Sequence, residues 1–188
     1  MNEKTPENAY AESRAGVLVC LAGVLEETQR SLFASDPKRL KQARGAARAE
    51  LAQALALLDG TAQSKESQAL LALAAAAEGL LERMQAGLAV DGPMTETAAA
   101  EASEVITLVR DAARDANDMT DAGASPHFRR YLLSNTAVVA RKVRELTAGN
   151  GKGPAGGAPG PVRPVLFLDL MRLLKGIADD LAAIAQDA

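Results

Sequence analysis

The stretch that decides the fold is residues 165–185, VLFLDLMRLLKGIADDLAAIA. Its large apolar residues recur alternately three and four positions apart, at Phe167, Leu170, Leu174, Ile177, Leu181 and Ile184. This spacing places all six side chains on one face of a helix and suits packing against nearly parallel or antiparallel neighbours. The stretch therefore predicts a long amphipathic helix within a helical bundle, over residues 164–185.

Helical periodicity recurs in five earlier stretches of the chain. Apolar residues at spacings of three and four predict helices over 9–34, 37–59, 64–90, 95–121 and 126–148. Asp36 followed by Pro37 is typical of a helix start, and Asp91-Gly92-Pro93 is typical of a turn. The apolar face expected for the helix over 126–148 consists of Phe128, Leu132, Val138, Val139, Val143 and Leu146.

The composition agrees with helices. Of 188 residues 40 are alanine, whereas only two Tyr and three Phe are present and Trp is absent. Alanine is the best helix former, and strands depend on the β-branched and aromatic residues that are scarce here. We therefore predict an all-α protein of six helices.

The chain reads as a tandem repeat. Aligning Pro37 with Pro126, an offset of 89 positions, overlays the first two helices of each half, and residues 37–58 and 126–148 each carry five basic residues and one acidic residue. We predict two three-helix units, 9–91 and 92–188, packed into an elongated helical bundle behind a disordered tail at 1–8. Residues 149–164, GNGKGPAGGAPGPVRP, predict a flexible Gly/Pro linker. They lack the spacing of a phosphate-binding loop.

Charge and residue counts restrict the function. A net charge of −3 and a pI near 5.3 disfavour nucleic acid as a partner. Cys20 is the single cysteine, which excludes an internal disulfide, and we expect it to be a small residue of the core. His127 is the single histidine, and we expect it to be exposed on a first helical turn. No apolar run reaches the roughly 20 residues of a membrane span, and no secretory signal is visible. For these two reasons we expect a cytoplasmic protein. We also expect a non-enzymatic protein, because no nucleophile system can be assembled from these residues.

Acidic residues supply the candidate sites. Glu104, Asp111, Asp115 and Asp118 share one side of the helix over 95–121. They form either a site for hard cations or a solvated face that Arg110 and Arg114 partly offset. Asn135, in the middle of the apolar run of the next helix, is a candidate register-fixing polar residue.

Two further acidic pairs are candidate metal ligands. Glu78 and Glu82 are four residues apart and so lie on one helix face, and Asp179 and Asp180 lie off the apolar face of the last helix. Either pair has carboxylates that could contribute to a surface metal site. The alternative is ordinary exposed charge.

The third helix of the second unit carries a short recognisable pattern: residues 175–180 are KGIADD and residues 184–186 are IAQ. This pattern resembles the third helix of each unit in the PhoU family of phosphate-uptake regulators, which carries Glu-Arg-Ile-Gly-Asp-His and then Ile-Ala-Glu. The matching residues are Ile177, Asp179, Ile184 and Ala185. Glu78 and Glu82 take the two acidic places of the family's metal motif, whereas Lys175 stands where the second copy has its first acidic residue.

The resemblance implies a regulatory adaptor that contacts a phosphate transporter's ATPase or a sensor kinase. It further implies a divalent or ferric metal ion at surface carboxylates, and we also expect a homodimer. A second hypothesis is a helical scaffold or chaperone-like module unrelated to phosphate. In that hypothesis the helix over 164–185 detaches and presents its apolar face to a groove in a partner.

Overall fold

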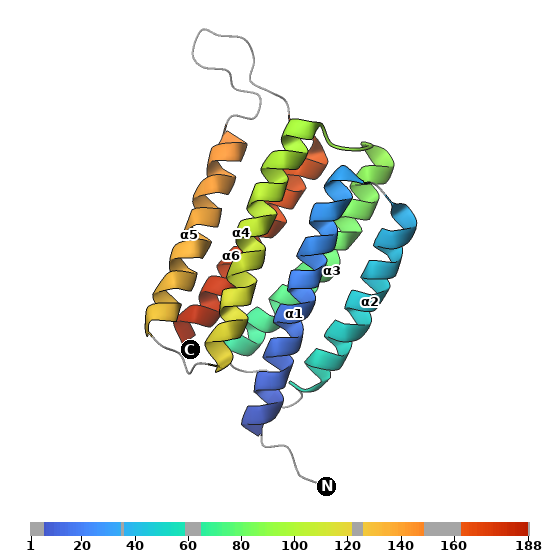
Figure 1. Cartoon of the computed structure of the whole chain (residues 1–188). Coiled ribbons are helices and arrows are strands. Elements are labelled where there is room, and N and C mark those ends of the chain that lie inside the picture. Colours follow the sequence, from blue (N-terminus) through green and yellow to red (C-terminus); the bar gives the residue numbers. More distant parts are fainter. Residues whose placement is uncertain (1–5, 35, 59–64, 122–125, 149–162, 188) are drawn as a thin grey trace.

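The structure, a computed structural model, describes residues 6–34, 36–58, 65–121, 126–148 and 163–187 (Figure 1). Its elements are the helices α1 (Pro6–Phe33), α2 (Pro37–Ala56), α3 (Lys65–Val90), α4 (Glu96–Asp121), α5 (Pro126–Ala148) and α6 (Val165–Asp187). The predicted all-α class is confirmed, with every helix end within three residues of its expected position. The expected tail and linker lie outside the described residues, apart from 6–8, which belong to α1, and 163–164.

Helices begin and end where the sequence has capping and turn residues. The Asp36 carboxylate accepts hydrogen bonds from the backbone N–H groups of Lys38 and Arg39, at 3.0 and 3.1 Å, and so caps α2. Thr95 similarly accepts from the backbone N–H of Ala98 at the start of α4. Between α3 and α4, Gly92 has a φ of 71°, which glycine adopts without steric cost.

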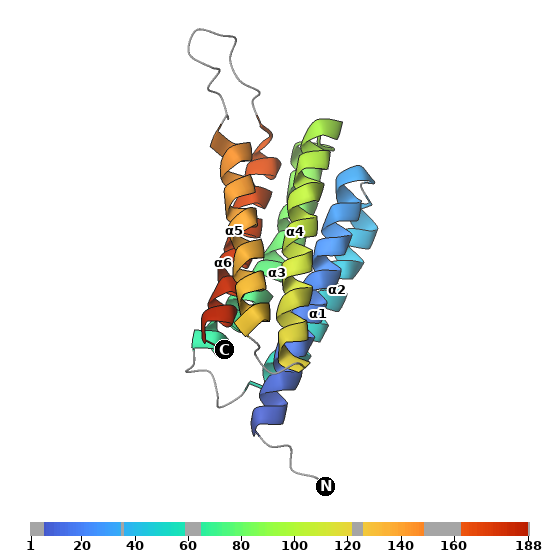
Figure 2. The same cartoon turned by 60° about the vertical axis from the view of Figure 1, so that its left-hand side comes forward.

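Four helices surround the centre of the bundle and two flank it (Figures 1 and 2). Around the centre, α1 packs on α4, α4 on α6, α6 on α3, and α3 on α1. Among the described elements, α2 contacts only α1 and α3, and α5 contacts only α4 and α6. Each half of the chain thus has the same internal packing, while the two-unit interpretation stays a prediction.

The core is continuous across both halves and receives side chains from all six helices. The six apolar residues that define α6 are fully buried. On α5 the expected apolar face is only partly correct: Leu132, Val139 and Val143 are buried, but Phe128 is 37% exposed. Phe128 lies on the first turn of α5, four residues before Leu132, which is the first buried residue of this helix.

A buried arginine fastens α1 to two neighbours. The Arg14 guanidinium donates to a Glu66 carboxylate oxygen on α3 at 3.0 Å and to the carbonyl oxygen of Ala116 on α4 at 3.0 Å. Further along α1, the Gln29 amide donates to the hydroxyls of Ser103 and Thr107 on α4. These contacts fix how far α1 slides along α4, because each polar group would otherwise lack its partner.

Among the helices that the structure describes, none is long and apolar enough to cross a membrane.

Candidate functional site

The first pair of predicted metal ligands lies on the side of α3 that faces α2. Glu82 is exposed and forms an ion pair with Arg44 of α2 at 3.3 Å. Glu78 is half-buried, and its charge is one of the influences on the Cys20 thiol of α1. Glu78 and Glu82 therefore lie at the contact between α3 and its neighbours, and the Glu82 carboxylate is already paired with Arg44.

The second pair lies on α6. Asp179 is exposed and forms an ion pair with Lys175 one turn earlier. Burial, and then the neighbouring Asp179 charge, raise the pKa of the half-buried Asp180 carboxyl. Across the described ranges, no three His, Cys, Asp or Glu side chains form a group suited to a metal ion, so neither pair is brought into such a cluster.

The acidic side of α4 is divided between neighbours and solvent. Glu104 pairs with Lys142 of α5 at 2.8 Å, and Asp115 accepts a hydrogen bond from the Asn135 amide of α5, also at 2.8 Å. Arg110 pairs with Asp111 at 3.9 Å, as expected, and also donates to Gln29 of α1, while Lys142 and Asn135 of α5 supply further compensation. Asn135 is half-buried and acts across the α4–α5 seam.

A series of adjoining depressions follows the seam between α1 and α2, which lie side by side in Figure 1. Two hollows of about 310 and 340 Å³ share Val19, Cys20 and Glu50. A third, of about 550 Å³, continues the second past Glu27 to Asp36. We name this continuous depression the α1–α2 groove; along α1 it extends from Glu12 to Glu27, about 22 Å at the helical rise.

Small residues bring the two helices close enough to make this groove. Gly16 of α1 lies against Ala54 of α2, and a Cβ atom at Gly16 would stand 2.9 Å from the Ala54 Cβ. Gly23, Ala43 and Ala46 also line the groove, so few side chains rise from its floor. The result is an open channel lined mainly by small side chains, which is not the enclosed pocket that a small substrate requires.

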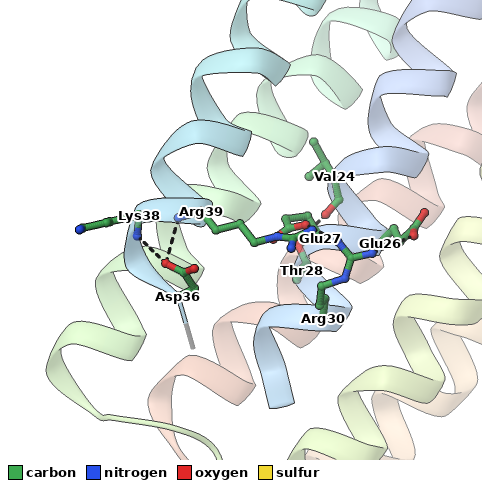
Figure 3. A network of polar contacts seen from close by, with 8 residues as sticks. All are labelled: Val24, Glu26, Glu27, Thr28, Arg30, Asp36, Lys38 and Arg39. Carbon is green, nitrogen blue, oxygen red and sulfur yellow. Dashed lines mark hydrogen bonds and ion pairs between the residues drawn. The ribbon is translucent and has the colours of Figure 1, made fainter. Parts of the chain in front are cut away.

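Polar contacts join α1 and α2 at the Glu27 end of the groove, which we call its upper end after its place in Figure 1; Figure 3 shows these contacts. Arg39 of α2 donates to Glu27 of α1 at 2.6 Å, and Arg30 pairs with the same carboxylate at 3.0 Å. Asp36 is occupied in capping α2. Charges at this end are therefore matched within the chain and hold α1 against α2.

The lower part of the groove has a different electrostatic character. Its lining includes the carboxylates of Glu12 and Glu50 and no basic side chain. Beneath them, Cys20 is 5% exposed, and its thiol donates to the carbonyl oxygen of Ala47 at 3.7 Å. Burial, followed by the nearby Glu50 carboxylate, raises the pKa of the Cys20 thiol from 9.0 to about 12. Cys20 is thus a neutral core residue, as expected.

Val19 is the most unusual residue of the groove. It is 62% exposed although its neighbours Leu18 and Cys20 are buried. Val19 also borders a hollow of about 210 Å³ between α1 and α4, and therefore forms a ridge between two depressions. An exposed apolar residue thus lies next to the Glu50 carboxylate in this part of the groove.

The α1–α2 groove was not predicted from the sequence. The available signal was Val19 itself, an apolar residue that falls outside the buried Leu18, Leu21 and Leu25 face of its helix.

The chain matches no protein-family model, no curated protein and no solved structure.

Proposed function

We propose that this protein is a non-enzymatic regulatory adaptor of the PhoU-like type, which binds an amphipathic helix of its protein partner in the α1–α2 groove. The observation that carries the proposal is the groove itself: an open channel with a small-residue floor, an exposed Val19 and an acidic lower half. Helix-in-groove recognition requires such a channel and apolar contacts at helical spacing.

Charge indicates the kind of helix that fits. Glu50 lines the lower half, and none of the side chains that line it is basic. A partner helix with Lys or Arg beside its apolar face complements this carboxylate, and the complementarity sets its orientation in the groove. At the upper end the matched Glu27 and Arg39 pair favours a neutral end of that helix.

The resemblance of residues 175–186 to the PhoU family supports a partner class. By that resemblance the partner is a phosphate transporter's ATPase or a sensor kinase. The flanking positions of α2 and α5 support the adaptor role as well, because each leaves an outer helix face open to a partner.

The scaffold hypothesis with a detaching last helix has less support. Its binding face would be the apolar face of α6, and this face is fully buried against α3, α4 and α5. Presenting it would open the core that all six helices share.

A charge substitution on the ridge tests the proposal. Val19→Arg places a bulky cation at the groove, while Val90→Arg, at an 83% exposed position at the end of α3, is the matched control. In affinity purification from the native host, wild type and Val90→Arg should recover the transport ATPase or the sensor kinase, with recovery by Val19→Arg lower by about tenfold. Both substituted positions are exposed, so thermal unfolding should change little.

The opposite pattern would refute the proposal. Equal recovery by Val19→Arg and wild type would exclude the groove as the docking site. If wild type recovers neither the ATPase nor the kinase, the PhoU-like assignment fails.

A further inference from the structure

The first two turns of α5 expose aromatic side chains in a chain that has very few. Phe128 is 37% exposed and Tyr131 is 53% exposed, three residues apart and so on neighbouring positions of one helix side. The His127 ring lies edge-on to Phe128, with centroids 6.5 Å apart and planes at 75°. We call His127, Phe128, Arg130 and Tyr131 the α5 aromatic patch.

Positive charge accompanies these rings. Arg130 is exposed and forms no ion pair within the described part of the chain. Several cations of the two flanking helices are matched, since Arg39 pairs with Glu27, Arg44 with Glu82 and Lys142 with Glu104, whereas Lys41, at the corresponding place on α2, forms no ion pair with a described residue either. In α5 the only acidic residue is Glu145, more than three turns away from Arg130.

The start of α2 provides an internal comparison. With Pro37 aligned to Pro126, the places of Phe128, Arg130 and Tyr131 are taken by Arg39, Lys41 and Gln42. The start of α2, which corresponds to the start of α5 in this alignment, therefore has no aromatic residue at these places. Phe128 and Tyr131 do not belong to the buried core, so their exposed parts form an apolar surface that a contact outside the molecule can cover.

The chemistry of the patch selects its ligand. Tyr and Arg are the residues that most often dominate protein–protein binding energy, and a guanidinium binds carboxylates with two parallel hydrogen bonds. A long polyanion such as nucleic acid is opposed by α4, which packs beside α5 and exposes Asp111 and Asp118. A short acidic stretch of polypeptide avoids this repulsion.

We infer that the α5 aromatic patch is a second docking surface, separate from the α1–α2 groove, for a short acidic segment of a partner protein. An aromatic or aliphatic side chain of that segment packs on Phe128 and Tyr131, and a carboxylate binds Arg130. The surface acts independently of the groove, since no residue of the patch borders it.

Fluorescence anisotropy with the full chain tests this inference. The probe is a short fluorescein-labelled peptide in which Asp and Glu flank one Phe and one Leu; a peptide with Lys in place of the acidic residues is its control. The acidic peptide should bind and the Lys peptide should not. The Phe128→Ala/Tyr131→Ala double variant and Arg130→Glu should each weaken binding by about tenfold.

Matched variants separate the patch from general charge effects. Lys41→Glu and Gln42→Ala occupy the corresponding places on α2 and should leave the affinity within about twofold of wild type. Val19→Arg should also leave it unchanged, which distinguishes this surface from the proposed groove. Circular dichroism melts of the Arg130, Lys41, Gln42 and Val19 variants should coincide with that of wild type, because these side chains are exposed, and the melt of the Phe128→Ala/Tyr131→Ala variant should show that it stays folded at the assay temperature.

Three outcomes would overturn the inference. The first is no binding of the acidic peptide. The second is equal loss of binding in the α5 and α2 variants, which would indicate general charge attraction. The third is association with phosphatidylserine vesicles or a thymidine oligonucleotide that depends on Phe128 and Tyr131 while the peptide does not bind.

Discussion

At the scale of single residues, the reactivity of the Cys20 thiol measures how well the floor of the groove is buried. Its thiol is buried, hydrogen-bonded to Ala47 and next to the Glu50 carboxylate, and its pKa of about 12 lies well above the ordinary 9.0. Since only the thiolate reacts with alkylating agents, the folded protein should resist modification near neutral pH.

We predict that iodoacetamide modifies Cys20 of the folded chain at least about a hundredfold more slowly than in urea. Glu50→Gln should accelerate the reaction, because the Glu50 charge is the second cause of the raised pKa after burial. Glu78→Gln, which removes a weaker influence, should have a smaller effect. Mass spectrometry of timed samples measures all three rates, and a fast reaction in wild type would contradict this description of the groove floor.

Asp180 makes a second prediction at this scale. Because its folded-state pKa is raised above the ordinary 3.8, the folded protein favours the neutral carboxyl. The resulting stability is present below pH 3.8 and is lost as pH rises through the folded pKa. Asp180→Asn should therefore raise the unfolding temperature at pH 7 and have little effect at pH 3.

Asp179→Asn is the control for that measurement. It also removes a charge beside Asp180, but it breaks the ion pair with Lys175 and so should stabilise less. Thermal melts with and without added divalent cation address the predicted metal site as well. If cations stabilise wild type but neither variant, Asp179 and Asp180 are metal ligands, and the description of Asp180 as a destabilising charge is wrong.

At the scale of helices, the close approach of α1 and α2 makes the groove. A methyl group at Gly16 would meet the Ala54 Cβ at 2.9 Å, whereas one at Gly23 of the same helix would meet nothing within 4 Å. Gly16→Ala should therefore destabilise by about 1–3 kcal/mol through overpacking. Gly23→Ala should stabilise by about 0.5–1 kcal/mol, because alanine favours the helix.

Urea unfolding of the two variants provides the comparison. Adding Ala54→Gly to Gly16→Ala should recover much of the lost stability, since it removes the opposing methyl group. Similar stability of Gly16→Ala and Gly23→Ala would show that α1 and α2 are not held at this distance.

Helix positions were largely predictable from the sequence, and the reasons are local. Apolar spacing located each helix, and Asp36 with Pro37 marked the start of α2 where the structure has it. Phe128 was wrongly assigned to the buried face, because the three- and four-residue spacing continues through the first turn of α5, whereas the buried face begins only at Leu132. The groove was not predictable for a related reason: it depends on Gly16 and Ala54 meeting across two helices.

The candidate metal residues illustrate the same limit. Spacing correctly puts Glu78 and Glu82 on one side of α3, but packing directs Glu82 to Arg44. Pairing between helices is a property of the assembled bundle. The sequence pattern therefore identified carboxylates without revealing which of them had partners.

At the scale of the whole molecule, the central ring of α1, α3, α4 and α6 is a fixed frame. The buried Arg14 and the continuous core resist rearrangement of these helices. The flanking α2 and α5 each contact only two neighbours among the described helices, and both proposed docking surfaces involve them. Partners should thus bind to a preformed surface while the core remains closed.

Hydrogen–deuterium exchange of the complex with the recovered ATPase or kinase tests this central claim most directly. The account predicts slower exchange on the partner-bound side of α1 and α2, between residues 12–27 and 43–57, with exchange along α6 unchanged. Faster exchange along residues 165–185 on binding, or protection that avoids α1 and α2, would contradict it.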